Sequence, residues 1–188
     1  MYKNLKTISW IINSRCNLKC LHCYTKSIQS EELRPDYSEK DIALMAKNIG
    51  SVNPEVVYIS GGEPLIDKDL PIFLKEALKI ASKSLCLCTN GMLISDKLVE
   101  ILKKNRVNGV SLSLRHPDPL KESKISQSKE VHERVLEAVK KLRLVGIDVA
   151  LEMTITKLNY DSIDDFIDLC VHNEVNTIIF KRFRPIGR

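Results

Sequence analysis

Short runs rich in β-branched residues alternate with longer stretches of helical periodicity from one end of this chain to the other. The alternation predicts parallel strands joined by right-handed helical crossovers. With 188 residues the chain is too short for a closed eight-stranded barrel, which takes about 250. We therefore expect an α/β fold with an open, partial barrel, and a flat doubly wound sheet is the alternative. The expected strands are residues 7–13, 55–60, 84–89, 109–114, 148–156 and 176–183.

Capping residues mark the helices that separate these strands. Ser38 and Asp41 have the spacing of a capping box. Ser95 can cap the start of the helix that follows the third expected strand. Gly146 is placed to end the helix that precedes the fifth strand. No linker or low-complexity segment interrupts the pattern, so we expect one domain over residues 1–188 that ends just after the sixth strand.

Two neighbouring expected strands carry polar residues on one face. Ser111, Ser113 and Arg115 alternate with apolar residues in and after the fourth strand, and Glu152 and Thr154 do so in the fifth. Parallel sheets usually bury both faces, so a polar face needs an explanation. We interpret it as the lining of a wet cavity, and the exposed face of an edge strand is the alternative.

Three cysteines, Cys16, Cys20 and Cys23, follow the first expected strand, on the side where parallel α/β folds bind ligands. Three thiolates can bind three irons of a 4Fe-4S cluster and leave the fourth iron open to an external ligand. A zinc site that adds His22 is the main alternative, although adjacent His22 and Cys23 are poorly placed to share one ion. Three cysteines without any metal are the remaining alternative.

The sequence has no run of about 18 apolar residues and no export signal at its start, which predicts a cytoplasmic protein with reduced thiols and no membrane partner. Cys86, Cys88 and Cys170 are then interpreted as small buried apolar residues. The net charge of +5 is spread over helical segments, and the basic end "KRFRPIGR" is interpreted as a solvated terminus in preference to a nucleic-acid site.

Four motifs together resemble the radical S-adenosylmethionine (radical SAM) enzymes. "CNLKCLHC" is similar to the CxxxCxxC signature, and "SGGEP", "TNG" and "SLSL" lie at the ends of the second, third and fourth expected strands. The resemblance covers nearly the whole chain and implies a partial (β/α)6 barrel, open on one side. It also implies that Cys16, Cys20 and Cys23 hold a 4Fe-4S cluster whose fourth iron is chelated by the methionine group of SAM.

The resemblance further implies which residues surround SAM. Gly61, Gly62 and Glu63 would fix the methionine amino end, where glycine permits positive φ angles and a close approach of the backbone to the ligand. Ser113 matches a serine that commonly contacts SAM. The other implied cofactor-binding residues are His22 near the adenine, Asn90 in the cavity wall and, as weaker candidates, Glu152 and Thr154.

Arg115 departs from the family pattern, in which an aspartate commonly follows "SL". Its guanidinium would grip a carboxylate of SAM or of the substrate, or pair with Glu152 across the cavity. The next residues, 116–128, form a long polar segment. It is expected to be either a substrate-contacting lid or a mobile surface loop.

The implied reaction is one-electron cleavage of SAM to methionine and a 5'-deoxyadenosyl radical that abstracts a substrate hydrogen, with a flavodoxin or ferredoxin as electron donor. "FKRFRPIGR" resembles the segment preceding the C-terminal SPASM or twitch auxiliary-cluster region, whose bearers commonly modify peptides or build cofactors. That region is absent here, so a fragment or a minimal member is expected. An RNA-modifying relative and a non-catalytic iron-sulfur or metal module are the alternatives.

Overall fold

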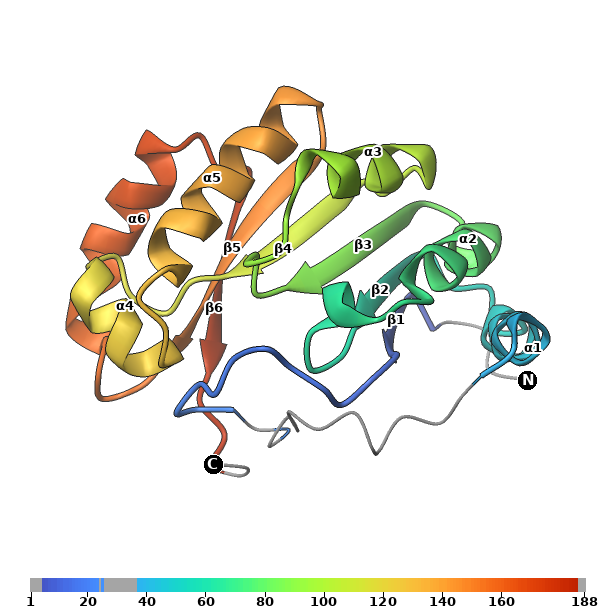
Figure 1. Ribbon diagram of the computed structural model, residues 1–188, viewed down its shortest axis with the longest axis horizontal. Helices are drawn as coiled ribbons and strands as arrows, with labels where there is room; N and C mark the ends of the chain where they lie inside the picture. Colours follow the sequence, from blue (N-terminus) through green and yellow to red (C-terminus); the bar gives the residue numbers. More distant parts are fainter. Residues whose placement is uncertain (1–4, 24, 26–36, 186–188) are drawn as a thin grey trace.

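The computed structural model describes residues 5–23, 25 and 37–185. Its six strands form one sheet in which all neighbouring pairs are parallel and the spatial order follows the sequence. The sheet curls into an open half-barrel (Figure 1). The partial-barrel prediction is confirmed, and the doubly wound alternative is wrong because such a sheet reverses its strand order. The strands are β1 (Thr7–Ile11), β2 (Val56–Ser60), β3 (Ser84–Thr89), β4 (Gly109–Ser113), β5 (Asp148–Ile155) and β6 (Thr177–Arg182).

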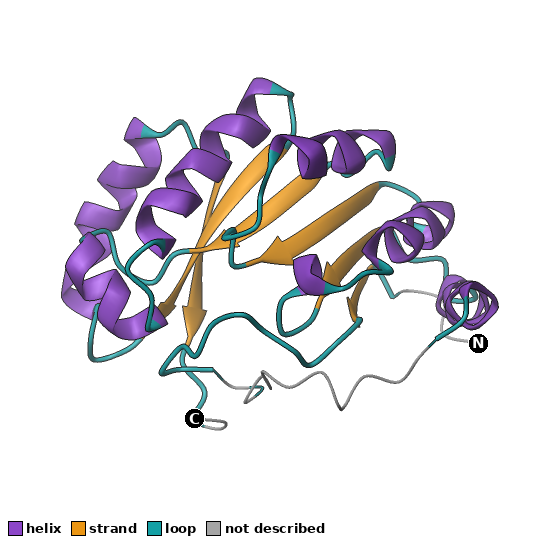
Figure 2. Ribbon diagram, viewed as in Figure 1, coloured by secondary structure: helices purple, strands orange, loops and turns teal. Residues whose placement is uncertain are grey.

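The helices gather on one side of the sheet (Figure 2). The predicted caps are present: Ser38 and Asp41 form a complete capping box, and the Ser95 hydroxyl accepts a hydrogen bond from the first turn of its helix. Gly146, with φ at +76°, lies just beyond the helix that it was expected to end. The helices are α1 (Glu39–Gly50), α2 (Leu70–Ile80), α3 (Asp96–Lys104), α4 (Pro119–Ser126), α5 (Val131–Leu144) and α6 (Ile163–His172), with short 3-10 turns at η1 (Pro64–Ile66) and η2 (Tyr160–Ser162).

The helix-facing side of the sheet is apolar and holds the core. Alternate residues of each central strand point to it and are fully buried, as the two-residue period of a strand requires. Trp10 of β1 packs edge-on against Phe73 of α2, with ring centroids 5.2 Å apart. The central strands supply Val57, Ile59, Leu85, Leu87, Val110, Leu112, Val149, Leu151 and Met153 to this core.

The opposite, concave face is polar and only partly buried, as the alternation in β4 and β5 predicts. Cys86 and Cys88 lie on this face, because Leu85 and Leu87 take the core positions of β3. The interpretation of Cys86 and Cys88 as buried apolar residues is therefore wrong. It is confirmed for Cys170, which is 1% exposed in α6.

Residues 116–128 contain a helix, so the alternative of a mobile surface loop is wrong, and a role of this segment as a substrate-contacting lid stays a prediction. Asp118 caps α4 by accepting hydrogen bonds from the backbone N–H groups of Leu120 and Lys121, at 2.8 and 2.9 Å. Pro119 occupies the first helical position, where proline is tolerated. The inner face of α4 is buried, with Glu122 completely enclosed.

The basic segment near the end of the chain is divided between β6 and the residues after it. Lys181 belongs to β6 and is exposed, and it forms an ion pair with Glu152 at 2.7 Å. Arg184 is exposed, and Arg188 lies outside the described residues. No helix in the described part of the chain is long and apolar enough to cross a membrane.

Candidate functional site

The three cysteines lie on one loop, residues 12–23, which we call the cysteine loop. It leaves β1 and runs past the carboxyl ends of the other strands (Figure 1). Its first half is joined to the turn after β2, because Gly62 N–H donates to Asn13 O at 2.9 Å and Glu63 N–H donates to Arg15 O at 2.6 Å. The "SGGEP" motif therefore anchors the cysteine loop.

Glycine is required after β2 because the cysteine loop approaches so closely. A Cβ on Gly62 would lie 2.1 Å from the carbonyl oxygen of Arg15, and one on Gly61 would lie 2.9 Å from that of Asn13. In the described residues, only Gly91 and Gly146 are glycines with positive φ. The close approach expected of this motif is thus made to the chain's own backbone, and the positive φ expected for Gly61 and Gly62 is not found.

Glu63 joins the end of β2 to the end of β3. Its carboxylate is completely buried and accepts hydrogen bonds from the Thr89 hydroxyl at 2.6 Å, Asn90 N–H at 2.7 Å and Leu65 N–H at 3.0 Å. Burial raises the pKa of this carboxyl group, and these hydrogen bonds oppose the rise. The Glu63 carboxylate therefore already has hydrogen-bond partners within the fold, and its contact with the methionine amino group stays a prediction.

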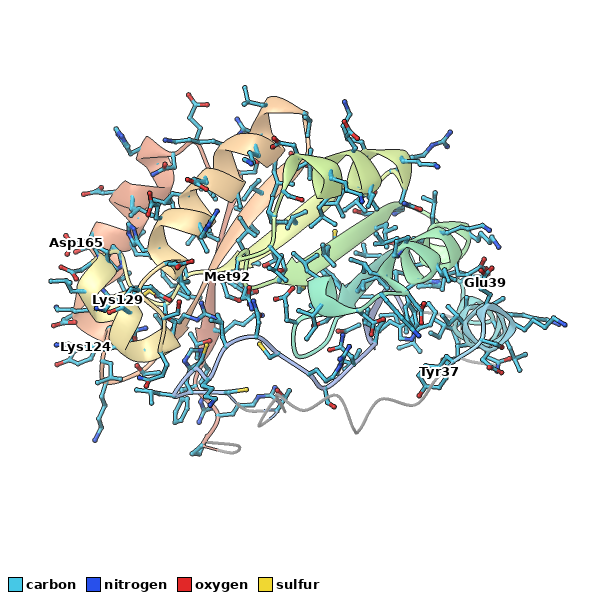
Figure 3. The ribbon with its side chains drawn as sticks, in the orientation of Figure 1. Tyr37, Glu39, Met92, Lys124, Lys129 and Asp165 are labelled. Carbon is cyan, nitrogen blue, oxygen red and sulfur yellow. The ribbon has the colours of Figure 1, made fainter. Side chains whose placement is uncertain are left out.

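Asn90 makes the second connection between the sheet and the cysteine loop. Its side-chain amide donates to the Asn17 side-chain oxygen at 2.7 Å and lies 3.7 Å from the Cys16 sulfur. Its own side-chain oxygen accepts from Met92 N–H at 3.0 Å, which fixes the orientation of the amide. Figure 3 labels Met92 near the centre of the molecule, beside the end of β3. The predicted wall residue Asn90 thus also orients a predicted cluster ligand.

The three thiols share a mostly enclosed environment. Cys20 is buried and Cys16 and Cys23 are half-buried against the core. Burial raises the pKa of Cys16 and of Cys20. The Cys16 sulfur accepts a hydrogen bond from Leu18 N–H at 3.4 Å.

The donor set fits a cluster better than a single ion. In the described residues no three His, Cys, Asp or Glu side chains converge on one metal position. The zinc alternative needs such convergence of His22 with the cysteines, whereas each thiolate of an iron-sulfur cluster binds a different iron. Three thiols on one loop that hydrogen bonds attach to the strand ends suit three corners of a 4Fe-4S cluster.

His22 is a neutral imidazole in this site. Burial, with a further contribution from the positive charge of Arg115, lowers its pKa to about 4, and Glu152 opposes the shift. Its Nδ1 atom is buried and has no hydrogen-bond partner. A buried polar atom without a partner is available to a ligand.

Ser113 and Glu152 lie together on the concave face, as predicted. The Glu152 carboxylate accepts hydrogen bonds from Ser111 at 2.8 Å, Ser113 at 3.1 Å and Lys181 at 2.7 Å. Burial disfavours its ionised form, but Lys181 and the serines outweigh burial and hold its pKa below the ordinary value. The alternative in which Arg115 pairs directly with Glu152 is wrong, and its contact with a carboxylate of SAM or of the substrate stays a prediction.

Arg115 pairs with Glu122 of α4 instead, a partner that the sequence analysis missed. Its Nη1 atom lies 3.3 Å from a Glu122 oxygen and 3.0 Å from the Ser113 carbonyl oxygen, and its Nε atom is buried without a partner. Thr154 is half-buried on the concave face at the end of β5. Its carbonyl oxygen accepts from the Asn159 side chain at 2.9 Å.

Fold and site together define a parallel α/β half-barrel with a three-cysteine loop anchored over the carboxyl ends of its strands. The sequence profile of the Radical SAM superfamily matches residues 10–170, and the chain belongs to this superfamily. Its members use a 4Fe-4S cluster and S-adenosylmethionine.

The curated proteins with similar sequences are named as different enzymes. Fe-coproporphyrin III synthase of Methanosarcina barkeri is 30% identical over 183 residues, which is 96% of this chain and 45% of the relative. GTP 3',8-cyclase of Clostridium perfringens is 29% identical over 94% of this chain and 54% of its own length. The chain thus spans about half the length of the curated relatives that it matches.

Solved structures show the same fold. Streptococcus suis SuiB bound to S-adenosylmethionine superposes with a TM-score of 0.83 over 98% of this chain and 42% of SuiB, at 23% identity. A second SuiB structure, bound to the precursor peptide SuiA, has a TM-score of 0.81. These likenesses support the half-barrel architecture.

Proposed function

We propose that this chain is the core of a radical SAM enzyme that modifies a peptide or builds a cofactor from a precursor. The observation that carries the proposal is the attachment of the cysteine loop to the sheet at Gly62 and at Asn90. A loop held in this way presents three thiols at the carboxyl ends of the strands, where parallel α/β folds place their reactive groups.

The chemistry supplied by the cluster and SAM together, when bound, is one-electron cleavage of the sulfonium to methionine and a 5'-deoxyadenosyl radical. The chain's own part is to hold both groups and to keep water away from the concave face. Cys16, Cys20 and Cys23 would hold the cluster. We assign SAM to the strand ends around Gly61, Gly62, Glu63, Asn90, Ser113, Glu152 and Thr154, with His22 near the adenine.

The substrate class rests on the relatives. SuiB was solved with a precursor peptide, and the curated relatives are named for a nucleotide and a porphyrin product. A flavodoxin or ferredoxin would supply the electron, and the cytoplasm would keep the thiols reduced. An RNA substrate is the alternative, and it predicts an association that weakens steeply with salt.

The test is anaerobic reconstitution with iron and sulfide, followed by dithionite and SAM, with 5'-deoxyadenosine as the measured product. We expect product from the parent and none from Cys20→Ser. Cys170→Ala is the matched control, because Cys170 is a core cysteine on α6 and should leave product formation intact. Equal product from Cys20→Ser and the parent would contradict the assignment.

A further inference from the structure

Arg115 carries a positive charge into the interior of the protein. It follows β4 directly and is 6% exposed, and in the described part of the chain it is the only arginine or lysine that is buried. Burial of an ion pair adds little net stability, because desolvation offsets the attraction. The pair of Arg115 with Glu122 is therefore poorly explained as a device for stability alone.

Arg115 lies near the part of the cysteine loop that holds Cys20. Glu122 and Ile125 are three residues apart on the buried face of α4, so they are neighbours on that helix. Glu122 pairs with Arg115 at 3.3 Å, and the Ile125 carbonyl oxygen accepts a hydrogen bond from the residue after Cys20. The guanidinium charge and Cys20 are therefore held against the same helical turn.

Helix α4 fixes both residues in place. Glu122 holds the Arg115 side chain and also accepts hydrogen bonds from the backbone N–H groups of Arg115 at 2.7 Å and His116 at 2.9 Å. Leu21, the residue after Cys20, donates its N–H to the carbonyl oxygen of Ile125 at 2.9 Å. One short helix therefore sets the position of the arginine relative to the cysteine loop.

We propose that Arg115 is a positioning residue that acts through Cys20, where its buried charge favours the reduced state of the cluster, and that Glu122 moderates this effect. The proposal rests on the proposed function, since it requires a cluster on the cysteine loop. Reduction adds one negative charge, and a fixed positive charge nearby stabilises the more negative state. Salt screens a buried charge only weakly.

The two partners of the ion pair should then have opposite effects. Arg115→Gln removes the favourable charge and should lower the equilibrium constant for cluster reduction about tenfold, which is about 59 mV for one electron. Arg115→Lys keeps the charge and should recover most of this loss. Glu122→Gln removes the opposing charge and should shift the potential upward.

The experiment is a redox titration of the reconstituted proteins without SAM, followed by electron paramagnetic resonance, with iron and sulfide content measured in parallel. Lys124→Gln is the matched control, because Lys124 is an exposed residue on α4 (Figure 3) and its loss changes the net charge equally. We expect less than a twofold change in the equilibrium constant for this control.

The outcomes separate the explanations. Opposite shifts for Arg115→Gln and Glu122→Gln would support the proposal, because both variants break the same ion pair. Shifts in the same direction, or none, would overturn it in favour of a structural role. An unchanged potential with weaker SAM binding in Arg115→Gln would overturn it in favour of a direct contact with SAM. A parent that assembles no cluster would overturn this proposal together with the proposed function.

Discussion

Asn90 and Asn17 lie 73 positions apart in the sequence, yet their side chains are joined by a hydrogen bond of 2.7 Å. The same amide of Asn90 approaches the Cys16 sulfur, so one side chain connects β3 with a predicted cluster ligand. Several measurable consequences depend on contacts of this kind between the sheet and the cysteine loop.

Asn90→Ala should loosen the cysteine loop. Loss of the buried amide leaves the Asn17 oxygen without its donor, and we expect unfolding to become easier by about 1–3 kcal/mol. Iodoacetamide should then modify Cys16 faster in the metal-free protein, as measured by peptide mass spectrometry. Asn105→Ala is the control, because Asn105 bonds only locally at the end of α3 and should not change Cys16 reactivity.

Gly62→Ala should prevent the close packing of the cysteine loop on the turn after β2. The added Cβ meets a backbone oxygen, which cannot swing aside, and we expect a loss of about 1–3 kcal/mol in urea unfolding. Cluster content after reconstitution should fall as well. Gly109→Ala offers a contrast, because its Cβ would find its nearest neighbour at 3.5 Å. Equal losses in the two variants would refute the steric explanation.

Asp118→Ala should affect the cysteine loop through α4. Removal of this cap costs about 1 kcal/mol and frays the helix that contacts Leu21 and holds Glu122. We expect faster alkylation of Cys20 in the metal-free protein. Ser95→Ala removes the cap of α3 at a similar cost to stability but should leave Cys20 unchanged. Faster alkylation in both variants would indicate a general loss of stability instead.

Glu152→Gln should change the pH dependence of stability. The pKa of Glu152 is lower in the folded protein than its ordinary value of 4.5, so its ionised form stabilises the fold above that pH. We expect the parent to exceed the variant by about 1 kcal/mol near pH 7. The difference should vanish as pH falls through the lowered pKa, which urea titrations at several pH values would reveal. A difference that grows on acidification would contradict the assignment.

Local patterns predicted the strands well. The two-residue period of a strand and the capping residues of the helices on either side can both be recognised from residues close together in the sequence. The same period could have placed Cys86 and Cys88 on the concave face, since Leu85 and Leu87 alternate with them. Helix α4 was missed because few apolar residues mark its inner face. Its signal was Asp118 followed by Pro119, a cap and a first-turn proline.

The contacts within the site were largely outside the reach of sequence reasoning. The motifs indicated Glu63 and Asn90 as important residues, but their hydrogen bonds to Thr89 and Asn17 join segments far apart in the chain. The pair of Arg115 with Glu122 required the position of α4 to be known. Such partners depend on how the strands and helices pack together, and the periodicity of neighbouring residues does not predict this packing.

The hydrogen bond from Leu21 to Ile125 has a consequence for maturation. The cysteine loop follows the first strand, but its last anchor belongs to the helix after the fourth. The thiols therefore reach their final arrangement only when more than half of the polypeptide has folded, and contacts across such a separation form slowly. Iron and sulfide would accordingly bind after α4 has packed against the cysteine loop.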